Sequence, residues 1–127
     1  MIPYGKQDIT QKDIDAVIDA LTSENLTQGP LVTQFEEALS SYLQSNFGVA
    51  VNSATSGLHI ACLSLGLSEG DIVWTSPISF VASANCALYC GASIDFVDID
   101  LVTHNISIEL LKEKLEQAER DEVLPKI

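Results

Sequence analysis

Residues 49–59 read Val49-Ala-Val-Asn-Ser-Ala-Thr-Ser-Gly-Leu-His59. A short apolar run is followed by small hydroxyl residues and a glycine, and then by an apolar stretch that is typical of a helix. The order strand, turn, helix places backbone N–H groups and a helix dipole where they can hold a phosphate. Ser53, Thr55 and Ser56 can add hydroxyl donors, and Gly57 leaves out a side chain where a ligand must approach closely. The alternative is an ordinary helix N-cap, which Ser, Thr and Asn favour without any ligand.

A second turn of the same kind follows the next apolar run. Residues 72–76 predict a strand that ends in small polar residues. Pro77 stops this strand because proline donates no ladder hydrogen bond. Phe80 then begins the next predicted helix, on the same edge of the sheet as the first turn. A phosphate-binding turn with an aromatic ring beside it suits a planar, phosphorylated cofactor.

Helical and strand patterns alternate along the chain. Apolar residues at positions i, i+3, i+4 and i+7 predict two amphipathic helices before residue 45, the first of them capped by Thr10 with Asp13. Beyond these helices the patterns predict three strands, at residues 48–52, 72–76 and 93–97. They also predict two intervening helices, at residues 56–65 and 80–90, and a final helix at about residues 107–120.

Strands that alternate with short helices indicate an α/β fold with right-handed crossovers and a largely parallel sheet. Ligands of such sheets gather at the carboxyl ends of the strands. The turns at residues 53–57 and 76–80 both lie at such ends. The predicted topology therefore agrees with a binding site formed by the two turns.

Charge and composition exclude several classes of protein. The net charge of −12, from 18 acidic and 6 basic residues, argues against nucleic acids and anionic membranes as partners. A hydrophobic content of 46% and a mean hydropathy of +0.22 are high for a small domain, so some apolar surface is expected to pack against further segments or a partner. The first residues lack the basic and apolar regions of a secretory signal.

The three cysteines are Cys62, Cys86 and Cys90. An odd number of cysteines without a secretory signal indicates a reducing compartment, and we therefore expect a cytoplasmic protein. A metal site would need further ligands, and His59 and His104 lie at distant spacings. Buried free thiols and no bound metal are the expected outcome.

Three motifs carry a resemblance to a known family. The segments Asn52-Ser-Ala-Thr-Ser-Gly57, Thr75-Ser-Pro-Ile-Ser-Phe80 and Leu26-Thr-Gln-Gly-Pro30 resemble the DegT/StrS family of sugar-nucleotide aminotransferases. Residues 81–91 and 2–5 are closer still to one member of that family. The resemblance covers essentially the whole chain but only the N-terminal third of such an enzyme.

The resemblance implies a type I aminotransferase-like fold that binds pyridoxal 5′-phosphate. The chain would be the N-terminal part of the large, cofactor-binding domain, with residues 1–45 as a helical arm and residues 46–127 as the βαβ portion. The complete enzyme would move an amino group, from glutamate as the expected donor, to a 4-keto sugar nucleotide. Type I aminotransferases place the active site between two subunits, so a homodimer is also implied.

The resemblance also assigns roles to individual residues. Thr55 and Ser56, with Ala54, would hold the cofactor phosphate, and Phe80 would stack on the pyridine ring. The remaining assigned residues would line the sugar-nucleotide side of the cleft; they are Tyr4, Leu26, Thr27 and Asn85. For Asn85 a hydrogen bond within the first turn of its own helix is the alternative.

The resemblance implies that catalytic groups lie elsewhere. The family's Schiff-base lysine and the acidic partner of the pyridine nitrogen both come later than Ile127 would allow. No lysine of this chain is expected in an apolar pocket of the kind that lowers a lysine pKa. We therefore expect a fragment that is inactive by itself.

Two alternatives remain open from the sequence. A flavodoxin-like module that binds flavin mononucleotide could use residues 53–57 as its phosphate turn, although two helices precede that turn here. A non-catalytic remnant that survives by dimerising is the second alternative. A dinucleotide-binding domain is disfavoured because the chain contains no G-x-G-x-x-G motif.

Overall fold

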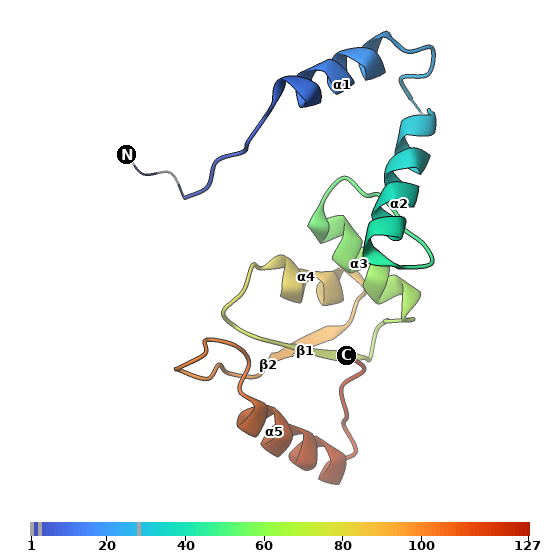
Figure 1. The fold of residues 1–127 in the computed structure, drawn as a ribbon. Coiled ribbons are helices and arrows are strands. Elements are labelled where there is room, and N and C mark those ends of the chain that lie inside the picture. Colours follow the sequence, from blue (N-terminus) through green and yellow to red (C-terminus); the bar gives the residue numbers. More distant parts are fainter. Residues whose placement is uncertain (1, 3, 28) are drawn as a thin grey trace. The chain divides into compact units, whose positions relative to one another are not determined.

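The computed structural model describes residues 2, 4–27 and 29–127 (Figure 1). Met1, Pro3 and Gln28 lie outside the described residues, so part of two quoted motifs cannot be placed. The chain forms two compact units, Met1–Ala50 and Val51–Ile127. No helix among the described residues is long and apolar enough to cross a membrane.

The first unit contains the helices α1 (Gln11–Thr22) and α2 (Pro30–Leu43). The predicted cap of α1 is confirmed, because the Thr10 N–H donates to Asp13 Oδ2 at 2.7 Å. Pro30 is the first residue of α2, where its missing N–H costs no helical hydrogen bond. The apolar face of α1 is exposed, and its residues Ile14, Val17, Ile18 and Leu21 are 44–61% accessible.

The predicted strand at residues 48–52 is wrong. The Ala50 N–H donates to Glu36 Oε1 at 2.7 Å, so this segment is tied to α2. A Cβ at Gly48 would come within 2.8 Å of Ser40 Oγ and 2.9 Å of Glu36 O, so only glycine allows this approach. A strand exists only beside a hydrogen-bonded neighbour, and no described segment pairs with residues 48–52.

The second unit carries the parallel sheet. Its elements are α3 (Ala54–Ser64), β1 (Ile72–Thr75), α4 (Ala82–Tyr89), β2 (Ser93–Phe96) and α5 (Ile108–Arg120). β1 and β2 are parallel, with Ile72 opposite Ser93 and Thr75 opposite Phe96. The β1–α4–β2 unit confirms the predicted crossover, and Gly66 and Gly91 follow their helices at positive φ as expected.

Helices cover both faces of the two strands. Val73 of β1 belongs to the buried cluster that α3 and α4 form with the sheet, which contains Cys62, Leu67, Val73, Cys86, Ala87 and Ala92. Trp74 points to the opposite face, since successive side chains of a strand alternate. There the Lys114 Nζ of α5 lies 4.9 Å from the centre of the Trp74 ring. All three cysteines are free, and burial raises the pKa of the Cys62 thiol to about 11.

One ion pair fastens α5 to the sheet. Lys114 Nζ lies 2.5 Å from Asp95 Oδ2 and donates to the Phe96 carbonyl at 2.7 Å. The hydrogen bond from Lys114, together with the Phe96 N–H, lowers the pKa of Asp95. The Asp95 side chain is 57% exposed, so solvent screens much of this interaction.

We expect Asp95→Asn to destabilise the protein at neutral pH but not in strong acid. A carboxylate with a lowered pKa stabilises the fold above its ordinary pKa of 3.8 and loses this contribution as the pH falls through the folded value. The expected loss is about 0.5 kcal/mol of unfolding free energy at about pH 7, measured by urea titration. Glu119→Gln on α5 is the control, and an equal loss for Asp95→Asn at about pH 2 would contradict the prediction.

Candidate functional site

A small hollow lies at the carboxyl edge of the two strands. It has a volume of about 160 Å³ and is lined by the aromatic rings of Phe80 and Phe96 and by Ser76, Ser79 and Ser83. The structure places Phe80 two residues before α4, and the Phe80 side chain is 75% exposed. Its ring is therefore open to a planar ligand. The sequence did not lead us to predict Phe96 as a site residue. Its position at the end of a predicted strand, where ligands of parallel sheets bind, could have indicated it.

The N-terminus of α3 is capped by its own side chains. Ser53 is the N-cap, and its Oγ accepts from the Ser56 N–H at 3.2 Å. The Ser56 hydroxyl donates to Asn52 Oδ1 at 2.7 Å. The N-cap alternative is thus realised in the structure. Asn52 has a role in orienting Ser56 that the sequence analysis did not assign.

The N-terminus of α3 also has backbone N–H groups without a hydrogen-bond acceptor among the described residues. No described residue accepts a hydrogen bond from the N–H groups of Ala54 and Thr55. These groups lie at the positive end of the helix dipole, where an anion is stabilised. The N-cap and an anion site therefore use different N–H groups, and one does not exclude the other.

Gly57 leaves room beside these donors. A Cβ built at this position would meet only Val51 Cγ2, at 3.5 Å, which is ordinary van der Waals contact. The fold itself therefore does not require glycine here. A ligand phosphate that approached the N–H groups closely would be a reason for the missing side chain.

The start of α3 and the segment up to the end of α4 have no basic side chain of their own. Residues 51–91 contain no lysine or arginine. Three lysines lie in α5 and in the segment after it, and each forms an ion pair. The pairs are Lys112 with Glu116, Lys114 with Asp95 and Lys126 with Asp71.

The remaining predicted site residues are divided between the units. Asn85 lies on α4 and is half-buried, and its backbone N–H donates to the Val81 carbonyl at 2.9 Å. Tyr4, Leu26 and Thr27 lie in the first unit and are exposed. That these residues share one cleft with Asn85 stays a prediction. Among the described residues no group of three or more His, Cys, Asp or Glu side chains is arranged to hold a metal ion.

Comparison with known proteins gives a consistent result. Residues 7–125 match the model of the DegT/DnrJ/EryC1/StrS aminotransferase family. A UDP-4-amino-4,6-dideoxy-N-acetyl-β-L-altrosamine transaminase from Campylobacter jejuni is 50% identical over 99 residues, which are 78% of this chain and 26% of that enzyme. The spore coat polysaccharide biosynthesis protein SpsC of Bacillus subtilis is 39% identical over 83% of this chain and 27% of its own length.

Solved structures show the same relationship. A putative sugar aminotransferase from Streptococcus pneumoniae, in its PLP form, superposes with a TM-score of 0.83 at 34% identity, over 88% of this chain and 29% of that one. The predicted type I aminotransferase-like fold is thereby confirmed. The chain spans about a quarter to a third of the length of the curated relatives that it matches.

We expect Gly57→Ala to stabilise the isolated chain. Gly57 lies inside α3, where alanine is favoured over glycine by about 0.5–1 kcal/mol, and the new methyl group meets only Val51. Thermal unfolding measures the effect. Gly48→Ala is the matched control and should destabilise, because its methyl group would meet Ser40 Oγ and the Glu36 carbonyl. If Gly57→Ala instead lowers the stability, the fold itself requires glycine at this position, and the prediction is wrong.

Proposed function

The chain belongs to the DegT/DnrJ/EryC1/StrS aminotransferase family, and we propose that it is the cofactor-binding N-terminal part of a sugar-nucleotide aminotransferase. The observation that carries this proposal is the pair of free N–H groups of Ala54 and Thr55 at the start of α3, next to the space at Gly57. The family match favours this function over a flavodoxin-like module.

The residues present fit pyridoxal 5′-phosphate. The N–H groups of Ala54 and Thr55 and the Thr55 hydroxyl would hold the phosphate, which the helix dipole also stabilises. The Ser56 hydroxyl would join them only by turning away from Asn52. The exposed ring of Phe80 would stack on the pyridine ring, and α3 packs against the helix that follows Phe80.

The bound cofactor supplies the electron sink for the transfer of an amino group. The residues of this chain contribute binding and orientation. We propose glutamate as the amino donor and a 4-keto sugar nucleotide as the acceptor, with Tyr4, Leu26, Thr27 and Asn85 on the sugar-nucleotide side. The name of the relative that is 50% identical supports a UDP-linked 4-amino-4,6-dideoxy sugar. We further propose a role in pseudaminic acid biosynthesis and a cytoplasmic location.

The proposed phosphate site is tested with pyridoxamine 5′-phosphate. This compound has no aldehyde, so it cannot react with surface lysines. Its addition should shift the amide NMR signals of residues 54–57, and pyridoxamine without the phosphate should not.

The double substitution Thr55→Ala with Ser56→Ala should weaken binding at least about fivefold, because hydrogen bonds to a charged group are lost. Ser64→Ala at the other end of α3 is the control. Unchanged affinity in the double variant would show that the two hydroxyls do not hold the phosphate. Unshifted amide signals at residues 54–57 would leave this turn as a plain N-cap.

We further propose that the chain forms a homodimer through its first unit. The exposed apolar face of α1 supports this, since such a face on a helix marks an interaction surface. Light scattering should give twice the mass of the chain, and Val17→Glu with Leu21→Glu should shift the mass toward the monomer. Asp15→Glu on the same helix is the control. A wild-type chain that stays monomeric at high concentration would contradict the proposal.

A further inference from the structure

The hydroxyl groups of Ser53 and Ser56 belong to one chain of hydrogen bonds at the start of α3. The Ser56 N–H donates to Ser53 Oγ at 3.2 Å, and the Ser56 hydroxyl donates to Asn52 Oδ1 at 2.7 Å. The two serine oxygens also lie 3.2 Å apart. A serine hydroxyl has one hydrogen, so Ser56, which gives its hydrogen to Asn52, accepts in this contact. The hydrogen between the two serines therefore comes from Ser53.

The chain of hydrogen bonds ends on the side-chain carbonyl of Asn52. A carbonyl oxygen only accepts, so Asn52 fixes the direction in which both hydroxyl hydrogens point. The hydrogen of Ser53 goes to Ser56, and that of Ser56 goes to Asn52. Neither serine has a hydroxyl hydrogen left for a ligand in this arrangement, and the lone pairs of their oxygens repel an anion.

A phosphate and Asn52 would compete for the same hydroxyl. Ser56 lies in the first turn of α3, beside the N–H groups of Ala54 and Thr55 that would hold the phosphate. A hydrogen bond to a charged acceptor is about twice as strong as one to a neutral acceptor, which favours the phosphate. To reach it, however, the Ser56 hydroxyl must leave Asn52 and also its contact with Ser53. Asn52 therefore works against the phosphate.

We propose that Asn52 is a positioning residue that competes with the phosphate for the Ser56 hydroxyl and so lowers the affinity of this turn for a phosphorylated ligand. This inference rests on the phosphate site proposed above. Asn52 acts through Ser56 and does not itself touch the phosphate. A residue that only supports the turn would have the opposite effect, because its loss would weaken binding.

The test measures the affinity for pyridoxamine 5′-phosphate from the amide NMR signals of residues 54–57. Asn52→Ala should tighten binding about threefold, because the Ser56 hydroxyl no longer gives up an exposed, neutral hydrogen bond to reach the phosphate. In the Ser56→Ala background the same substitution should change nothing, since the contested hydroxyl is absent. In the Thr55→Ala background the threefold gain should remain, which makes this background the matched control.

A second substitution guards against a loosened turn. Asn52→Leu keeps the size of the side chain, removes its carbonyl and should give the same gain as Asn52→Ala. Binding that is unchanged or weaker in both variants overturns the proposal, while shifted signals at residues 54–57 in the wild type still support the phosphate site. A gain that persists in the Ser56→Ala background also overturns it, because Asn52 would then act by another route. Unshifted signals in the wild type overturn the phosphate site and this inference together.

Discussion

The pairing of β1 with β2 is the constraint on which the second unit depends. Parallel strands cannot be joined by a tight turn, so the chain must cross over the sheet, and α4 is that crossover. The crossover brings Cys86 and Ala87 onto Val73 and forms the core with α3. It also sends the segment after β1 and the end of β2 to one edge, where Phe80 and Phe96 line the same hollow.

The start of α3 shows how one helix end can serve both stability and binding. The first turn of a helix has N–H groups without helical partners. Ser53 takes the N–H of Ser56, which satisfies the fold, and the N–H groups before it are left for a ligand. Because residues 51–91 contain no lysine or arginine, these N–H groups and the helix dipole are what this segment offers to a phosphate.

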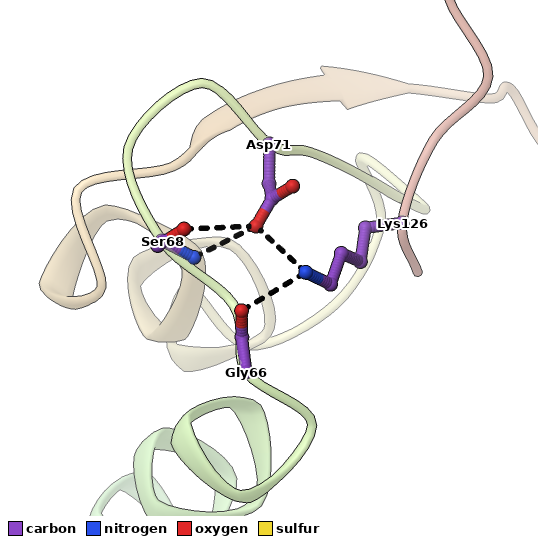
Figure 2. Close-up of polar contacts among 4 residues, drawn as sticks. All are labelled: Gly66, Ser68, Asp71 and Lys126. Carbon is purple, nitrogen blue, oxygen red and sulfur yellow. Dashed lines mark hydrogen bonds and ion pairs between the residues drawn. The ribbon is translucent and has the colours of Figure 1, made fainter.

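The sheet also explains why the chain exposes so much apolar surface. Two strands and three helices bury a core made mainly of small residues, and no large side chain among the described residues is completely buried. The curated relatives are about three times as long as this chain, which agrees with apolar faces that pack on further structure. Polar contacts also join distant parts of this unit: Lys126 Nζ donates to the Gly66 carbonyl and to Asp71 Oδ2 (Figure 2).

The sequence by itself determined the elements with local causes. The Thr10–Asp13 cap, the glycines after α3 and α4, and the parallel β1–α4–β2 unit were all predicted, because capping, positive φ and apolar periodicity act within a few residues. Only the tertiary structure decided which segments pair as strands and which residues far apart in the sequence make contact. Residues 48–52 have a strand-like pattern but no neighbour, and Ala50 bonds to Glu36 instead. The contact of Lys126 with Asp71 joins groups 55 residues apart, and no local pattern encodes such a distance.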